Sequence, residues 1–173
     1  RVVLVTGGSS GIGLATVELL VDEGARVATC ARALGRLQSA VRHLDPDRVL
    51  AVGCDVTDPD AAAALVEAAV DRFGRLDALV NNAGSGRLGR LGDLSDEDWR
   101  AELDAKVFGV LNPIRAAVEH LARSDAARIV NLSAVSAREP DPAMLAVSTA
   151  RAAVSSLSRG LAAELVDRGI LVN

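Results

Sequence analysis

Val5-Thr6-Gly7-Gly8-Ser9-Ser10-Gly11-Ile12-Gly13 follows an apolar run that begins at Val2 and opens a segment with the apolar spacing of a helix. The stretch therefore predicts a strand, a glycine turn and a helix. Glycines suit this turn because residues without a Cβ adopt left-handed angles freely and let backbone N–H groups approach a phosphate. The helix N-terminus adds partial positive charge and unpaired donors, so the turn favours a pyrophosphate ligand. A turn with only a structural role is the alternative, since Thr16 breaks the G-x-G-x-x-G spacing.

Short apolar runs alternate with helix-periodic segments along the rest of the chain. Nearly continuous apolar runs are typical of strands whose two faces are both covered by helices, and the alternation implies right-handed crossovers. The sequence thus predicts an α/β fold, a doubly wound parallel sheet in a single domain spanning residues 1–173. The predicted strands are 1–6, 26–30, 49–53, 76–80, 128–133 and 170–172, and the predicted helices are 12–23, 34–44, 59–73, 95–123 and 145–168.

Two local signals refine the second half of the chain. Four glycines between Gly84 and Gly92 predict a loop. Ser95 and Asp98 have the spacing of a capping box at the start of the helix that follows. Pro113 lies inside that helix, where it should produce a kink or mark a junction.

Composition limits the classes of function. A formal net charge of −4 provides no basic surface for nucleic acid, and no apolar run reaches the roughly 20 residues of a membrane span. We expect a cytoplasmic protein with no nucleic-acid or membrane partner. Cys30 and Cys54 each end a predicted strand, which favours buried thiols over a disulfide or a metal pair. The two histidines form no metal motif, so no metal is expected.

Three motifs carry a resemblance to a known family. The opening T-G-x-x-x-G-I-G, the block Asn81-Asn82-Ala83-Gly84 and the closing run Gly169-Ile170-Leu171-Val172-Asn173 occur in the order found in the short-chain dehydrogenase/reductase family, classical type. The resemblance implies a Rossmann-like, NAD(P)-binding fold. It also implies a further loop, helix and strand after Asn173, so we expect a fold truncated after the start of its sixth strand.

The resemblance also indicates which dinucleotide binds. Relatives that prefer NAD carry an acidic residue at the end of the second strand, and that position here is Ala31, followed by Arg32. An Arg can make charge-assisted bonds to a 2′-phosphate that a carboxylate would repel. NADP is therefore favoured, with NAD possible and a solvated Arg32 as the alternative. Ser10, where many NADP-preferring relatives carry a second basic residue, argues the other way.

The cofactor site that the resemblance implies extends over four segments. Asp55 occupies the place of the residue that contacts adenine, although a turn or cap carboxylate is an equal alternative. The full set of expected cofactor-binding residues is Thr6, Gly7, Ser9, Ser10, Gly11, Ile12, Gly13, Arg32, Asp55, Val56, Asn82, Ala83, Gly84 and Arg151.

The catalytic residues of the family are replaced in this chain. Its members use an Asn, Ser, Tyr and Lys set, in which Tyr passes a proton and Lys lowers the pKa of that Tyr. The Y-x-x-x-K block falls on Val147 to Arg151, the family Ser on Ala134 and the Asn on Lys106. A one-residue slip in this assignment restores Ser133 or Ser148, but no slip restores a Tyr, because the chain contains none.

Two hypotheses of function follow, and a third concerns the sequence itself. The first is an NADP(H)-binding protein with lost or very weak hydride transfer, acting as a cofactor-responsive scaffold or as a non-catalytic subunit. The second is a working carbonyl reductase or alcohol dehydrogenase in which Lys106, Ser133 or Ser148 replaces the missing Tyr and Arg151 holds the nicotinamide ribose. Lys106 serves as an acid only if it does not instead reach solvent or pair with Asp104 or Glu102. The third is a truncated or altered form of an ordinary dehydrogenase.

The expected partners also follow from the resemblance. A small-molecule carbonyl or alcohol is the expected substrate of an active chain. The long helices 95–123 and 145–168 match those through which family members commonly associate. We therefore expect a homo-oligomer or association with a related subunit.

Overall fold

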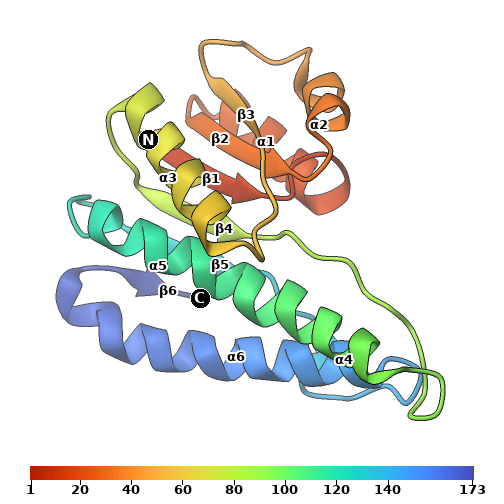
Figure 1. Ribbon diagram of the computed structural model, residues 1–173. Coiled ribbons are helices and arrows are strands. Elements are labelled where there is room, and N and C mark those ends of the chain that lie inside the picture. The colour runs from red at the N-terminus through yellow and green to blue at the C-terminus, as the bar shows by residue number, and fades with distance from the viewer.

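The computed structural model describes all residues 1–173, which form one six-stranded sheet with helices on both faces (Figure 1). All strand pairs are parallel and their order is β3-β2-β1-β4-β5-β6. The predicted Rossmann-like α/β fold is thus confirmed. The strands are β1 (Val2–Thr6), β2 (Arg26–Ala31), β3 (Val49–Gly53), β4 (Ala78–Asn81), β5 (Arg128–Asn131) and β6 (Leu171–Val172).

The helices lie between successive strands, as right-handed crossovers require. In Figure 1, α3, α5 and α6 cover one face of the sheet, and α1 and α2 cover the other. None of these helices combines the length and the apolar character needed to cross a bilayer. The helices are α1 (Gly11–Asp22), α2 (Leu34–Val41), α3 (Pro59–Phe73), α4 (Asp96–Leu103), α5 (Gly109–Leu121) and α6 (Leu145–Leu165).

The apolar core is divided by the sheet into two clusters. The cluster beneath α3, α5 and α6 holds 21 buried residues, whereas the one beneath α1 and α2 holds eight. Leu79 and Ile129 belong to the larger cluster, and Val5 and Val17 to the smaller. The large cluster therefore provides most of the hydrophobic stabilisation, which scales with the apolar area removed from water.

The local signals of the sequence are found at the helix ends. Ser95 and Asp98 form the predicted capping box, in which each side chain bonds the backbone N–H of the other residue. Asp58 is the N-cap of α3, and its carboxylate accepts from the backbone N–H groups of Asp60 and Ala61.

The helix predicted over 95–123 is continuous but changes type. A π-helical turn, η1 (Asp104–Phe108), joins α4 to α5. Pro113 lies within the first turns of α5, so the change of helix type falls just before it. In Figure 1, α4 and the loop that follows β4 project together beyond one edge of the sheet.

Two strand boundaries differ from the prediction by two residues. The run predicted as a strand over 76–80 begins as β4 at Ala78, and the Asp77 carboxylate before it accepts from the backbone N–H of Val2 and from the side chains of Arg75 and Ser124. Strand β5 ends at Asn131, two residues before its predicted end. Ser133 therefore lies in the loop after the strand, which places it at the cavity described below.

Candidate dinucleotide-binding site

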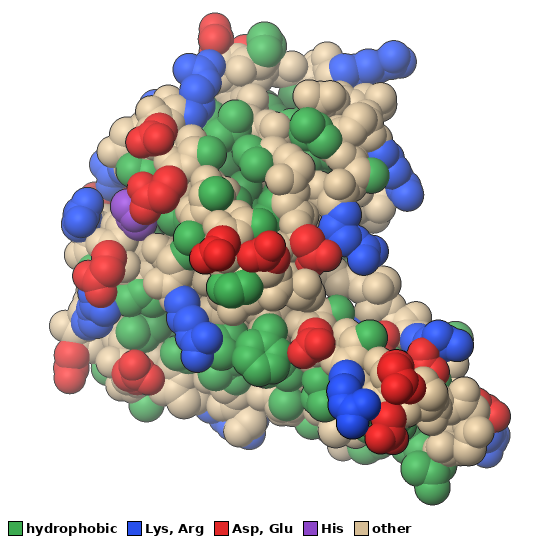
Figure 2. Space-filling view, in the orientation of Figure 1, with side chains coloured by type: hydrophobic (Ala, Val, Ile, Leu, Met, Phe, Trp, Pro, Cys, Tyr) green, Lys and Arg blue, Asp and Glu red, His purple; other side chains and the backbone are tan.

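A cavity of about 1050 Å³ opens at the carboxyl edge of the sheet. It lies where the strand order reverses, with β1 between β2 and β4, which is the usual place for a ligand in an open α/β sheet. In the space-filling view, a notch separates the main body from the projecting lobe (Figure 2). Thirteen residues predicted from the sequence line this cavity: Gly7, Ser9, Ser10, Gly11, Ile12, Arg32, Asp55, Val56, Asn82, Ala83, Gly84, Ser133 and Arg151.

The glycine turn adopts the left-handed angles that its sequence predicts. Gly7 and Gly11 have φ of 77° and 56°. A Cβ on Gly13 would lie 2.2 Å from the Gly7 carbonyl oxygen and 2.3 Å from Asn82 Nδ2. Gly13 does not line the cavity, and its lack of a side chain lets α1 pack directly against the turn.

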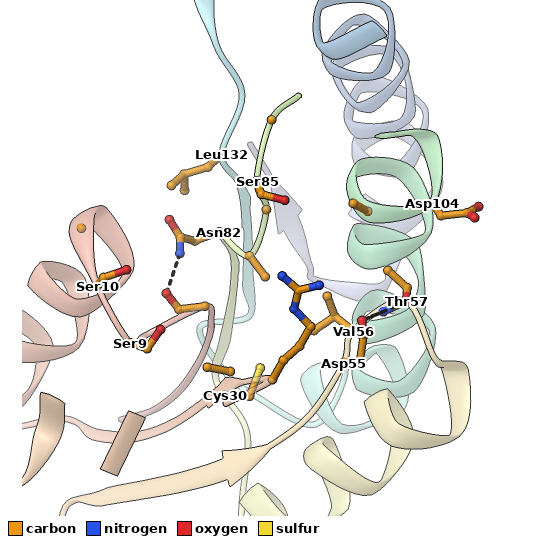
Figure 3. A pocket seen from close by; sticks show the side chains of 18 of the residues that line it. Ser9, Ser10, Cys30, Asp55, Val56, Thr57, Asn82, Ser85, Asp104 and Leu132 are labelled. Atoms are coloured by element: carbon orange, nitrogen blue, oxygen red, sulfur yellow. Dashed lines mark hydrogen bonds between the residues drawn. The ribbon is translucent and has the colours of Figure 1, made fainter. Parts of the chain in front are cut away.

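Thr6 and Asn82 fix the turn to the end of β4. Thr6 is fully buried, and its Oγ1 accepts from the backbone N–H groups of Asn82 and Ala83, each at 3.0 Å. Asn82 Nδ2 donates to the carbonyl oxygens of Thr6 and Gly7 at 2.9 and 3.1 Å. Figure 3 shows the Asn82 side chain directed at the turn. Thr6 thus supports the site from beneath rather than lining it.

The N-terminus of α1 presents unpartnered donors to this cavity. The Ser10 side chain, at the N-cap, makes no capping bond, and the first turn of the helix contains no acidic residue. A Cβ on Gly11 would meet nothing within 4 Å, so the approach to these N–H groups is open. A phosphate group fits such a turn, because it supplies the acceptors and negative charge that the helix terminus lacks.

The far end of the cavity lies beside β2 and β3. Ala31, Arg32 and Arg36 all line it, and the two arginines are exposed. Asp55 Oδ1 accepts from Thr57 N at 3.0 Å and from Thr57 Oγ1 at 2.8 Å (Figure 3). These bonds, and the charge of Arg32, hold the pKa of the Asp55 carboxyl below its usual value against the effect of burial. Asp55 therefore closes a turn and also faces the cavity.

The two cysteines lie on neighbouring strand ends at this side of the cavity. Cys30 and Cys54 are buried free thiols, so no disulfide joins them. Interaction between the two thiols raises the pKa of Cys30 and lowers that of Cys54. No group of three or more His, Cys, Asp or Glu side chains is arranged to hold a metal ion.

Of the positions where the resemblance implies catalytic residues, Ser133 and Arg151 line the opposite end of the cavity, whereas Lys106, Val147 and Ser148 do not line it. Val147 is buried in α6, and a Cβ on Gly86 would lie 3.4 Å from its Cγ2. Ser133 lines the cavity and shares a 3.1 Å hydrogen bond with Ser155. Ser148 is only 2% exposed and lies outside the cavity lining, and its Oγ has no hydrogen-bond partner.

The two basic candidates have different surroundings. Arg151 lines the cavity and donates from Nη1 to the carbonyl oxygen of Leu132. Burial lowers the pKa of Arg151, and the negative charge of Glu102 opposes that effect. Lys106 lies outside the lining and is 2% exposed, with Nζ 2.5 Å from Glu102 Oε2. Of the alternatives for Lys106, the pairing with Glu102 is the one that the structure contains.

Sequence reasoning missed several charged residues of the cavity, among them Arg36, Arg87 and Glu102. Arg36 lies four residues after Arg32, a helical spacing that could have placed both on one side of α2. Glu102 was considered only as a partner for Lys106, yet it lines the cavity itself. Arg87 lies in the glycine-rich loop and pairs with Asp98 at 2.5 Å, a contact that no local sequence signal indicates.

A Rossmann-type sheet whose glycine turn opens into a cavity at the carboxyl edge defines the class of nucleotide-binding α/β proteins. Comparison with known families is more specific: the short chain dehydrogenase family matches residues 1–173. The chain belongs to that family.

Individual relatives agree with this assignment. An uncharacterized oxidoreductase of Staphylococcus saprophyticus is 35% identical over 164 residues, which are 95% of this chain and 67% of the relative. The short-chain reductase protein NovJ of Streptomyces niveus is 37% identical over 174 residues, covering 99% of this chain and 66% of NovJ. The chain therefore spans about two thirds of the length of these relatives.

A short chain oxidoreductase from Pseudomonas aeruginosa PAO1 is similar in both sequence and structure. Its apo structure is 44% identical to this chain, with a TM-score of 0.96, and the match covers 100% of this chain and 68% of that protein. A second structure of the same oxidoreductase is bound to NADPH, with 44% identity, a TM-score of 0.95 and coverage of 99% and 68%. That protein is described as containing an atypical catalytic center.

Proposed function

We propose that this chain is an NADP(H)-binding member of the short-chain dehydrogenase family in which normal carbonyl or alcohol hydride transfer is lost or very weak. The observation that carries the proposal is Val147, a buried aliphatic residue packed on Gly86 where family members hold the proton-transferring Tyr. An aliphatic side chain can neither donate nor accept a proton. Loss of a general acid typically costs about 10² to 10⁴ in rate.

The cofactor half of the proposal rests on the cavity and on the NADPH-bound relative. Backbone N–H groups of residues 9–13 would bind the pyrophosphate, and Arg32 with Arg36 would bind the 2′-phosphate. Asp55 and Val56 would face the adenosine, and the block from Asn82 to Gly84 would line the wall between the two halves of the cofactor.

At the other end of the cavity, Arg151 would hold the nicotinamide ribose. When bound, the dinucleotide supplies hydride chemistry, and the protein supplies position and electrostatics. The guanidinium of Arg151 has donors besides the one that Leu132 accepts. These donors can orient ribose hydroxyls, but a guanidinium does not give up its proton in a protein.

The test of the proposal is calorimetric titration of NADPH and NADH into the purified chain, followed by assay with a panel of carbonyls. We expect NADPH to bind more tightly than NADH, with little or no turnover. Binding of neither dinucleotide would overturn the cofactor assignment, and ordinary turnover would overturn the proposed loss of activity.

The second candidate function is a working reductase with atypical catalytic residues. The buried Ser148 hydroxyl favours it, because a buried polar group without a hydrogen-bond partner is uncommon in native proteins. Ser133 is the other candidate hydroxyl, and its neighbour Ser155 is a hydroxyl too, which does not activate an alcohol. Lys106 would need to release Glu102 before acting as an acid. Turnover that persists in the wild type and disappears in Lys106→Ala or Ser148→Ala would establish this function.

The remaining expectations concern partners and location. We propose a cytoplasmic, single-domain protein that associates with itself or a related subunit through α4, α5 and α6. Phe108, which is 44% exposed on η1, and the hydrophobic side chains over α5 and α6 in Figure 2 support this surface. A carbonyl or alcohol would be the substrate of an active form. Sedimentation velocity of the purified chain measures the association.

A further inference from the structure

A buried ion pair lies next to the cavity but is not explained by cofactor binding. Glu102 and Lys106 are 5% and 2% exposed, and their charged groups are 2.5 Å apart. The two residues are one helical turn apart, Glu102 in α4 and Lys106 in the π-helical turn η1. A buried pair of this kind adds little stability, because removing both charges from water offsets most of their attraction.

Both members of the pair also bind the backbone of one loop. Lys106 Nζ donates to the carbonyl oxygen of Ser85, and Glu102 Oε1 accepts from the N–H of Arg87 at 2.7 Å. The loop 84–87 lines the cavity at the end opposite Arg32, and Figure 3 shows Ser85 close to this wall. The pair therefore binds the loop at two points: Lys106 supplies a donor to one carbonyl oxygen, and Glu102 supplies an acceptor to one N–H group.

Arg151 of α6 lies beside the same loop. The negative charge of Glu102 acts on Arg151 of α6, and a Cβ on Gly84 would lie 3.8 Å from Arg151 Nη2. The loop, α4 and α6 thus meet around Glu102. The pair therefore lies where the loop 84–87 meets the end of the cavity that Arg151 lines.

We propose that Glu102 and Lys106 are positioning residues that hold the loop 84–87 in place for the nicotinamide half of the cofactor. The inference rests on the proposed NADP(H) binding and assigns to Lys106 a role in binding geometry rather than in proton transfer. The adenosine half of the cavity, at Arg32 and Asp55, is lined by other elements and does not depend on the pair.

Two ligands allow binding to the adenosine half of the cavity to be measured apart from binding to the whole cavity. NADPH fills both, whereas 2′,5′-ADP carries only the adenosine, its 2′-phosphate and one phosphate of the bridge. Calorimetry with both ligands is performed on the wild type, on Glu102→Gln, and on the exchanged double variant Glu102→Lys with Lys106→Glu. In Glu102→Gln, the single amide oxygen can accept a hydrogen bond from either the Arg87 N–H or the Lys106 ammonium. The amide NH₂ group then faces the remaining donor and cannot accept from it.

We expect Glu102→Gln to weaken NADPH binding about tenfold or more, as loss of a hydrogen bond to a charged group implies. The affinity for 2′,5′-ADP should change less than about twofold, which is well below the change that loss of one hydrogen bond produces. The exchanged variant is the decisive control. It retains the ion pair, but it turns an ammonium toward the Arg87 N–H and a carboxylate toward the Ser85 oxygen. We expect it to bind NADPH no better than Glu102→Gln.

Full NADPH affinity in the exchanged variant, or an equal loss for both ligands, would overturn the positioning role. Hydrogen exchange of the wild-type Arg87 amide provides a test that needs no folded variant. Protection of that amide is expected, and exchange at the rate of an unstructured peptide would overturn the inference. Binding of neither ligand by the wild type would instead overturn the proposed cofactor function.

Discussion

Arg151 brings a fixed positive charge to one end of the cavity. Its guanidinium is half-buried, and burial lowers its pKa while Glu102 opposes the change. Because a guanidinium stays protonated, Arg151 can donate hydrogen bonds but cannot tune a neighbouring acid as a neutralisable amine can. Val147, four residues earlier in α6, is aliphatic and offers no acid for Arg151 to tune. Both residues are therefore consistent with the proposed loss of proton transfer.

Arg32 provides the first prediction at the scale of a residue. In Arg32→Ala we expect the affinity for NADPH to fall by about tenfold to a hundredfold, because a charge-assisted bond to the 2′-phosphate is lost. The affinity for NADH should change little. Arg42→Ala, which removes an exposed arginine from the end of α2 outside the cavity lining, is the matched control. Titration calorimetry measures all four affinities, and an equal loss for both dinucleotides would contradict this role.

At the scale of an element, the contact between α1 and the glycine turn leaves no space for a side chain. We expect Gly13→Ala to lower the free energy of unfolding by about 1–3 kcal/mol, because the new Cβ would overlap the Gly7 carbonyl and the Asn82 amide. Gly160→Ala, in the exposed interior of α6 with nothing within 4 Å of the new Cβ, is the control. It should stabilise the protein by about 0.5–1 kcal/mol. Urea denaturation measures both, and a neutral Gly13→Ala would disprove the tight contact.

The elements that the sequence predicted share strong local signals. The glycine turn and the Ser95 capping box each depend on a few neighbouring residues, and the structure contains both. The π-helical turn could not be predicted, because its wider hydrogen bonding depends on packing against α6 and the loop rather than on residue type.

The candidate site was less accessible to sequence reasoning than the fold. Glycines and Asn82 could be assigned from motifs, but the position of Ser148 outside the cavity and the contact of Glu102 with the loop arise from tertiary packing. Arg87 and Asp98 likewise meet only because the loop folds back on α4. Charges that pair across loops leave no periodic signal in the sequence.

At the scale of the whole molecule, the amino edge of the sheet is held by a charge network far from the cavity. Asp125 accepts from the side chains of Arg1 and Arg75, and Arg75 also pairs with the buried Asp77 at 2.5 Å. Hydrogen bonding to Arg1 is the main cause that lowers the pKa of Asp125 to about 2. Stabilisation from such a group is present above the pKa of the unfolded state, about 3.9, and is lost as the pH falls through about 2.

This network predicts the response of the fold to acid. The urea midpoint of the wild type should fall as the pH is lowered from about 4 to about 2, because protonation of Asp125 breaks its bonds to the arginines. The midpoint of Asp125→Asn should already be lower at neutral pH and should fall less over the same interval. Identical pH dependence in the two proteins would show that the network contributes nothing to stability.

The π-helical turn between α4 and α5 has a consequence for insertions and deletions. A π turn holds about one residue more than an α turn, so loss of a single residue within 104–108 would restore a regular helix from Asp96 to Leu121. Each residue of an α-helix advances its face by about 100°. Such a deletion would therefore rotate Glu102 away from the loop 84–87 while leaving α5 in the core. Most surface loops tolerate a one-residue change in length, but here such a change would remove the contact between Glu102 and the loop 84–87 that lines the cavity.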